Sequence, residues 1–175
     1  MVIETVEGLS EADISQCDFS FDIRSELVAP YRDPIEHARP VEPYRKAYAF
    51  DTDDFAEIGP DRLLAVAKVG GRLCGYILVS ESWNGYASVD DLAVDRPVRG
   101  SGVGLRLMDR AVQWARERGL PGIRLETQSN NVAACRFYKR YGFVLGGYDE
   151  YQYATFPALR HEVALFWYLM VPKDP

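Results

Sequence analysis

Histidine and cysteine are scarce in this chain, and their scarcity excludes several kinds of active site. The 175 residues include two histidines, His37 and His161, and three cysteines that lie far apart, Cys17, Cys74 and Cys135. Because none of the cysteines forms a C-x-x-C pair, they indicate neither a disulfide framework nor a zinc site. So few histidines also argue against a Ser/His/Asp triad, and we expect no protein-bound metal.

Long apolar runs and an excess of positive charge are missing as well. No apolar stretch approaches the roughly 18–20 residues that a membrane span needs. Residues 1–10 lack the basic and apolar regions of a signal peptide. The formal net charge is −6, and an acidic protein binds nucleic acid poorly but attracts small polycations. We therefore expect a cytoplasmic protein that acts on a small cationic molecule, with no nucleic-acid or membrane partner and with a homodimer left open.

Residues 62–171 show a regular succession of apolar runs, turn sequences and amphipathic segments. The strand–helix–strand unit over 87–128 needs a crossover connection, so its two strands can be parallel inside an otherwise antiparallel sheet. The predicted fold class is α/β, with a mixed, mainly antiparallel sheet, one central parallel strand pair and helices on both faces. The periodicity and the turn residues predict strands over 63–69, 72–80, 87–94, 122–128, 143–153 and 162–171, and helices over 104–118 and 131–141.

The first 60 residues are less regular. Alternating polar and apolar residues predict a strand over 21–29, and we expect a short helix over 42–50 and an acidic loop over 51–54. No repeat, low-complexity tract or linker divides the chain. We therefore expect a single domain over residues 1–175.

A glycine-rich segment, Arg99 to Gly104, separates the predicted strand 87–94 from the helix that follows. Glycines allow backbone N–H groups to converge, and a helix N-terminus adds unpaired donors and partial positive charge, so this segment can bind a phosphate. A Walker A loop is excluded because no Lys-Ser/Thr pair follows the glycines. A dinucleotide fingerprint would need a third glycine where Leu105 stands. That partial match and a simple tight turn remain as alternatives at this point.

Two motifs resemble those of the GNAT N-acetyltransferases. The first, after a strand that ends in Leu92-Ala93-Val94, resembles the superfamily's coenzyme A pyrophosphate motif and reads Arg99-x-x-Gly102-x-Gly104. The second resembles its downstream signature and reads Asn131-x-x-Ala134-x-x-Phe137-Tyr138-x-x-x-Gly142-Phe143. The similar region covers about residues 60–171 as an acetyl-CoA-binding core, whereas residues 1–40 form a divergent N-terminal segment.

A narrower resemblance is to the streptothricin (nourseothricin) acetyltransferases. It is carried by short collinear stretches from about residue 40 to the end of the chain, namely Pro43–Tyr48, Ser82–Ala87, Arg124–Gln128 with Asn130 and Asn131, Gly146–Asp149 and Phe166–Tyr168. The resemblance implies transfer of an acetyl group from acetyl-CoA to a primary amine, with the β-lysine amino group of streptothricin as the leading substrate. A GNAT enzyme for a polyamine, aminoglycoside or peptide, and a non-catalytic acyl-CoA sensor, are the alternatives.

The resemblance also implies which residues hold the cofactor and supply the proton for the leaving thiolate. Tyr138 is the candidate general acid, because a phenol of pKa about 10 can protonate a thiolate whose conjugate acid has a pKa of about 8.5. Asn131 is expected both to cap its helix and to reach the pantetheine arm. The implied cofactor-binding residues are Leu92, Ala93, Val94, Arg99, Gly100, Ser101, Gly102, Val103, Gly104, Asn131 and Tyr138.

The substrate amine must lose a proton, since an alkylammonium has a pKa of about 10.4. Asp90, Asp91 and Glu126 are the candidates to bind the ammonium or accept its proton, with Asp91 and Glu126 counted as catalytic. Neighbours on a strand face opposite sides, so only one of the two aspartates is expected to face the acetyl site. Trp83, Asn84 and Asp149 complete the predicted substrate-binding set. Four aromatic residues are candidates either for walls around a cation or for the core, namely Trp83, Tyr86, Tyr148 and Trp167.

Overall fold

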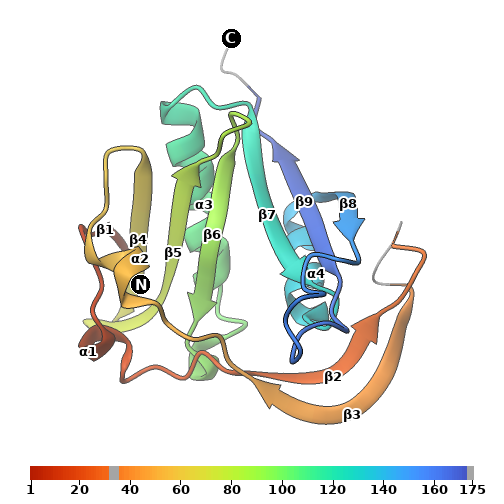
Figure 1. Ribbon diagram of the computed structural model, residues 1–175. Helices are drawn as coiled ribbons and strands as arrows, with labels where there is room; N and C mark the ends of the chain where they lie inside the picture. The colour runs from red at the N-terminus through yellow and green to blue at the C-terminus, as the bar shows by residue number, and fades with distance from the viewer. Residues whose placement is uncertain (32–35, 173–175) are drawn as a thin grey trace. The chain divides into compact units, whose positions relative to one another are not determined.

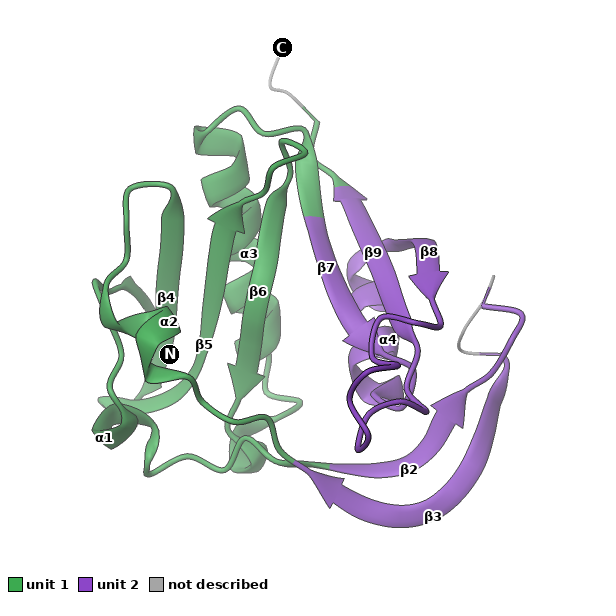
Figure 2. Cartoon of the chain, viewed as in Figure 1, with its two compact units in different colours: residues 1–21, 47–123, 170–175 green, residues 22–46, 124–169 purple. Residues whose placement is uncertain are grey.

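The computed structural model describes residues 1–31 and 36–172, and the chain divides into two compact units (Figure 2). Unit 1 consists of Met1–Phe21, Ala47–Ile123 and Met170–Pro175, and unit 2 of Asp22–Lys46 and Arg124–Leu169. The expectation of a single domain stays a prediction.

Unit 1 is built on four antiparallel strands in the order β1-β4-β5-β6. Gly70 and Gly71, with φ of 58° and 82°, form the predicted two-residue turn between β4 and β5. The three strands predicted in this region are confirmed, whereas the short and mostly exposed strand β1 lacks the apolar run that would have predicted it. The bounds are β1 Val2–Thr5, β4 Arg62–Val69, β5 Arg72–Glu81 and β6 Ala87–Val94.

Helices cover both faces of this four-stranded sheet (Figure 1). Helix α3, Val103–Glu117, packs along all four strands through a fully buried stripe that contains Leu107, Met108 and Ala111. On the other face lie α1, Glu11–Ile14, and α2, Thr52–Ala56. A second apolar cluster fills that side and contains Leu9, Phe55, Leu64, Val66, Tyr76 and Leu78. Burial on both faces explains why β4 and β5 are almost continuously apolar instead of alternating.

Helix α2 replaces the acidic loop predicted over residues 51–54. Asp51 is the N-cap, and its side chain accepts a hydrogen bond of 3.1 Å from the backbone N–H of Asp53. Asp53 and Asp54 lie in the first turn, where the helix dipole favours negative charge. The acidic run is therefore a helix start, and the loop prediction was wrong because it overlooked this capping pattern.

Unit 2 contains most of β7, Gly122–Gln128, followed by α4, Val132–Tyr141, β8, Val144–Asp149, and β9, Ala164–Met170. The strand order is β7-β9-β8, and β8 and β9 are antiparallel. The predicted strand over 143–153 ends at Asp149, because residues 150–161 form consecutive turns. Trp167 is 1% exposed at the centre of this unit, and its indole N–H donates to Thr127 Oγ1 at 3.0 Å. Of the two alternatives given for Trp167, this burial supports the core.

Strands β2, Phe21–Leu27, and β3, Ala38–Lys46, form a separate two-stranded ribbon. The strand prediction over 21–29 is confirmed, but the helix predicted over 42–50 is wrong. Residues up to 46 form a strand because they pair with β2. This pairing involves a separate segment of the chain, so it cannot be inferred from residues 42–50 alone. Pro40 and Pro43 lie within β3, and proline in a sheet is found mainly on strands that have an unpaired edge.

Candidate active site

The glycine segment of unit 1 has the backbone geometry of an anion cradle. After the short 3₁₀ helix Arg96–Val98, Gly100 and Gly102 adopt φ of 83° and 91°, a left-handed conformation that other residues rarely reach. Gly102 is the N-cap of α3 and makes no side-chain capping bond. A Cβ on either glycine would meet nothing within 4 Å. The first N–H groups of α3 follow Gly102 directly and have no acceptor within the helix, and this end of a helix favours an anion.

Arg99 ties this loop to the rest of unit 1. Its Nε donates to the carbonyl oxygen of Val94 at 2.9 Å, and its Nη1 donates to the carbonyl oxygen of Ser20 at 2.7 Å. The side chain is thus partly used to hold the loop backbone, in addition to bringing a positive charge beside the glycines.

Asp95 anchors the start of the same loop and was not singled out from the sequence. It is 1% exposed, forms an ion pair with Arg72, and accepts a hydrogen bond of 2.8 Å from the backbone N–H of Asp18. The N–H of Arg96 in turn donates to the carbonyl oxygen of Asp18 at 2.8 Å. The segment that precedes β2 therefore fastens the turn between β6 and the glycines. The only signal in the sequence is an aspartate at the end of a strand, which is too common to be diagnostic.

A β-bulge interrupts β6 at Asp90. Leu78 of β5 pairs with Asp91, but the next residue, Val79, pairs with Val89, so Asp90 is an extra residue on β6. In a regular strand, neighbouring side chains point to opposite faces, so Asp90 and Asp91 would lie on different faces of the sheet. The extra residue interrupts this alternation. Asp91 accepts a hydrogen bond from Tyr76, and Asp90 is hydrogen-bonded to Ser80, which lies on the same face of β5 as Tyr76.

Both aspartates therefore share one face of β6, and the expectation that they face opposite sides was wrong. Their shared face is the one covered by α2. Asp54 of α2 is close enough for its negative charge to influence both carboxyls.

Burial raises the pKa of both carboxyls. For Asp91 the loss of hydration is the main cause, opposed by the 2.7 Å hydrogen bond from the Tyr76 hydroxyl. For Asp90 desolvation again dominates, opposed by hydrogen bonds from Ser80 and Ser88. The pKa of Tyr76 is also strongly raised, first by burial and then by the neighbouring Asp91 charge. A cation placed here would relieve a costly concentration of negative charge.

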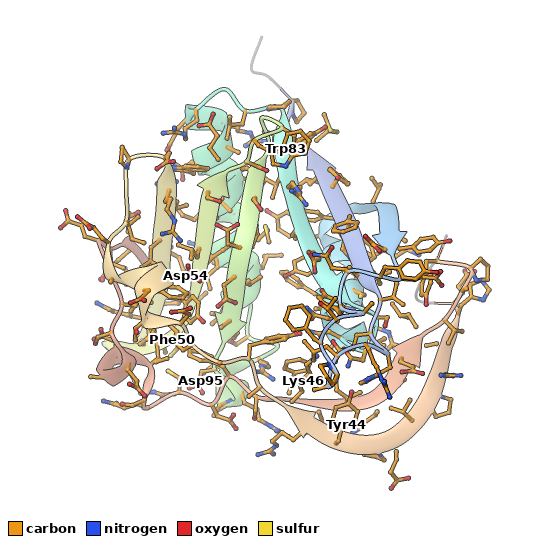
Figure 3. All side chains as sticks on the ribbon, in the orientation of Figure 1. Tyr44, Lys46, Phe50, Asp54, Trp83 and Asp95 are labelled. Carbon is orange, nitrogen blue, oxygen red and sulfur yellow. The ribbon has the colours of Figure 1, made fainter. Side chains whose placement is uncertain are left out.

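Aromatic rings surround the Tyr76–Asp91 pair on the α2 side. The ring centroids of Phe19, Phe55 and Phe50 lie 5.4, 5.2 and 6.3 Å from that of Tyr76, all in edge-to-face arrangements. Phe50 and Asp54 are both found near α2 in Figure 3. Neither residue could be recognised as a site residue from the sequence, because nothing in their local pattern relates them to β6.

Trp83 lies at the tip of the β5–β6 hairpin, at the opposite end of β6 from Asp95 (Figure 3). It is 92% exposed. Asn84 Oδ1 accepts a weak bond of 3.4 Å from the N–H of Tyr86, so Asn84 serves the turn. In unit 2, Asp149 similarly accepts from the N–H of Tyr151 at 2.7 Å. The assignment of Trp83, Asn84 and Asp149 to substrate binding stays a prediction.

Tyr138 and Asn131 both lie on α4 in unit 2. Asn131 is the N-cap, and its Oδ1 accepts from the N–H of Ala134 at 3.2 Å, which confirms the predicted capping role. Tyr138 is 7% exposed, with its ring edge-to-face against Phe137 and Phe143 at 5.2 and 5.5 Å. Packing on two sides restricts the Tyr138 ring to a narrow range of orientations.

Glu126 of β7 is exposed but held at one oxygen. The hydroxyl of Tyr153 donates a short hydrogen bond to its Oε1, and Gln128 Nε2 donates to the same hydroxyl at 3.1 Å. Tyr153 comes from the β8–β9 loop and belongs to no motif, so nothing in the sequence marks it as a site residue.

A buried ion pair joins the end of β3 to the loop that precedes β9 in unit 2. Lys46 Nζ lies 2.6 and 2.7 Å from the two carboxylate oxygens of Glu162, and the side chains are 13% and 2% exposed. Asn130 Nδ2 donates to Glu162 at 3.0 Å and to the hydroxyl of Tyr44 at 2.8 Å. Lys46 and Tyr44 are marked in Figure 3.

Among residues 1–31 and 36–172, no group of three or more histidine, cysteine, aspartate or glutamate side chains is arranged to hold a metal ion. Within the same described residues, no helix has the length and apolar character needed to cross a membrane.

The sequence of the chain is similar to a known family pattern and to several known proteins. The pattern of the Acetyltransferase (GNAT) family matches residues 22–143. The chain is 42% identical over 130 residues to streptothricin acetyltransferase of Escherichia coli, covering 74% of this chain and 72% of the relative. It is 38% identical over 127 residues to streptothricin acetyltransferase A of Bacillus subtilis, covering 72% and 73% of the two chains.

The solved structures include a Bacillus anthracis protein, provisionally named a streptothricin acetyltransferase, in complex with acetyl coenzyme A. It is 34% identical, has a TM-score of 0.81, and the match covers 97% of this chain and 99% of that one. This likeness confirms the predicted fold class, a mixed α/β sheet that is mainly antiparallel.

Proposed function

The chain belongs to the GNAT acetyltransferase family, and from this premise we propose that it acetylates a primary amine of streptothricin with acetyl-CoA as the donor. The observation that carries the proposal is the 42% identity to a streptothricin acetyltransferase over 74% of this chain. The acceptor we favour is the amino group of the β-lysine side chain. A homodimer, a lack of nucleic-acid partners and a cytoplasmic location remain predictions.

The glycine loop fits the pyrophosphate of acetyl-CoA. At Gly100 and Gly102 an added Cβ would meet no protein atom within 4 Å, so a ligand has room to approach the backbone there. We assign the pyrophosphate to the N–H groups of residues 100–104 and to Arg99. The backbone of Leu92, Ala93 and Val94, with Asn131, is assigned to the pantetheine arm. When bound, acetyl-CoA supplies the activated acetyl thioester.

Four side chains are assigned to binding the substrate ammonium and to the proton transfers. The acidic face of β6, with Asp90 and Asp91, binds the substrate ammonium, and Glu126 is the proposed acceptor of its proton. The ammonium loses two protons in all. Glu126 accepts the first before the attack and passes it to solvent. The second leaves nitrogen as the C–N bond forms and the C–S bond breaks, and it balances the proton that the sulfur gains. Tyr138 holds the proton for the sulfur at its hydroxyl.

The proposal is tested by presenting the purified protein and acetyl-CoA with streptothricin, an aminoglycoside and spermidine while the release of free thiol is followed. We expect rapid thiol release with streptothricin. Release with spermidine alone would refute the antibiotic substrate. Thiol release at background level with all three amines would favour an acyl-CoA sensor.

Replacing Tyr138 with phenylalanine is expected to lower kcat by about 100-fold or more, the usual contribution of a positioned acid or base. The Kd for acetyl-CoA should stay unchanged, because the ring and its packing against Phe137 and Phe143 are retained. Stopped-flow turnover and calorimetric binding give the two quantities. Tyr141→Phe, on the same helix, is the matched control. A kcat equal to that of the parent protein would remove Tyr138 from the mechanism.

Replacing Asp91 with asparagine is expected to raise KM for the amine by about 10-fold or more, because a hydrogen bond to a charged group is lost. Binding requires the ionised carboxylate, and the pKa of Asp91 is raised by burial. As the solution is acidified, Asp91 should therefore be protonated at a higher pH than an ordinary aspartate. In the parent enzyme, kcat/KM for the amine should begin to fall at that higher pH.

A pH profile of kcat/KM for both proteins checks this expectation, with Asp109→Asn on the exposed side of α3 as the control. An unchanged KM, or an acid limb that is identical in the Asp91 variant, would contradict it.

A further inference from the structure

Residues 150–163, which connect β8 to β9, form an ordered loop without a helix or strand. Successive turns hold it, with Phe156 N–H donating to the carbonyl oxygen of Tyr153 at 3.0 Å and Glu162 N–H to that of Leu159 at 2.8 Å. The loop is fastened to the residues that follow β7. Ser129 N–H donates to the carbonyl oxygen of Val163 at 2.9 Å, and Val163 N–H donates to Ser129 Oγ at 3.1 Å. Tyr153 is therefore presented to β7 from a defined backbone.

The two faces of β7 have different environments. Thr127 contacts Cys135 of α4, with 3.3 Å between Oγ1 and Sγ, so it faces the helix. Glu126 and Gln128 are its neighbours on either side and lie on the opposite face. Both of them meet the hydroxyl of Tyr153, whose side chain is 9% exposed. A mostly buried phenol thus reaches the face of β7 that carries the candidate base.

The directions of these two hydrogen bonds follow from the chemistry of the groups. The amide nitrogen of Gln128 can only donate, so the Tyr153 oxygen accepts that bond. The ionised carboxylate of Glu126 can only accept, so the single proton of Tyr153 is given to Oε1. The hydroxyl therefore has one acceptor role and one donor role, and both are satisfied by β7.

We propose that Tyr153 is a positioning residue, which holds the carboxylate of Glu126 in the orientation that receives the substrate amine. An exposed glutamate samples many rotamers, and a base acts efficiently only when it is within hydrogen-bond reach of the proton that it takes. By engaging Oε1, Tyr153 restricts the rotamers of Glu126 before the substrate arrives. This inference rests on the role given to Glu126 in the proposed function.

The test is a double-mutant cycle with Tyr153→Phe, Glu126→Gln and the double variant, all measured with acetyl-CoA and streptothricin. We expect Tyr153→Phe to lower kcat by about 10-fold, the loss typical of one hydrogen bond to a charged group. KM for acetyl-CoA should not change. In the Glu126→Gln background, the same substitution should have no further effect on kcat, because the carboxylate that it positions is gone.

Tyr151→Phe is the matched control, because Tyr151 belongs to the same loop but is 81% exposed. Equal losses from Tyr153→Phe in both backgrounds would overturn the inference, since a purely structural role does not depend on Glu126. An unchanged kcat for Tyr153→Phe or for Glu126→Gln would also overturn it while acetyl transfer itself still stands. The proposed function fails separately, if the parent protein releases no thiol with streptothricin.

Discussion

Replacing Gly102 with valine is expected to weaken acetyl-CoA binding by about 100-fold, which corresponds to about 2.7 kcal/mol. Gly102 has φ of 91°, and a non-glycine residue held in such a conformation costs about 1–3 kcal/mol. The loop can relieve this strain only by changing its backbone dihedrals, which would move the N–H groups that we assign to the pyrophosphate. The new side chain would also project into the open space that we assign to the pyrophosphate. Calorimetric titration with acetyl-CoA measures the loss.

Gly119→Val is the matched control for this prediction. Gly119 follows the C-terminal end of the same helix, has φ of 68°, and also has open space around the position of a Cβ. Both variants should therefore lose comparable stability in urea, but only the Gly102 variant should lose cofactor affinity. Equal Kd values for acetyl-CoA in the two variants would contradict our assignment of the loop.

Replacing Lys46 with methionine is expected to destabilise the protein by about 3–5 kcal/mol, because it leaves the carboxylate of Glu162 buried without its cation. Glu162 is 2% exposed, and Lys46 contacts both of its oxygens. The remaining bond from Asn130 Nδ2, at 3.0 Å, cannot replace the positive charge. Urea denaturation followed by circular dichroism gives the free energy of unfolding.

Two further variants show whether burial is the cause. Lys68→Met breaks a pair with Glu4 of almost equal length, 2.7 Å, but there the side chains are 37% and 44% exposed. This control should cost no more than about 1 kcal/mol. The double replacement of Lys46 and Glu162 by methionine should recover much of the stability, since no unpaired charge remains. Similar losses for Lys46→Met and Lys68→Met would contradict the argument.

The elements that were predicted well are those with local causes. Helix α3 follows from its apolar stripe and its flanking glycines, and the β4–β5 hairpin follows from Gly70-Gly71 between two apolar runs. The cap at Asn131 likewise depends on a residue only three positions away, Ala134. For the same reason, the anion cradle could be derived before any family resemblance was considered.

Two of the errors have their physical origin in contacts between distant segments, whereas the loop predicted over 51–54 missed a local cap at Asp51. Residues 38–46 form a strand because β2 pairs with them, and local propensity for a helix has no influence against that pairing. The two aspartates share a face because the register between β5 and β6 shifts by one residue at Asp90. No periodicity in β6 alone reveals which residue will be the extra one.

By itself, the sequence determined the fold class, the glycine turn before α3, the helix that carries Tyr138 and the family, because these depend on short patterns with specific backbone requirements. Only the tertiary structure decided how the candidate side chains are held. Tyr153 reaches Glu126 across 27 positions and Lys46 reaches Glu162 across 116. Such partners are selected by packing and by the need to satisfy buried polar groups, and these constraints exist only once the chain has folded.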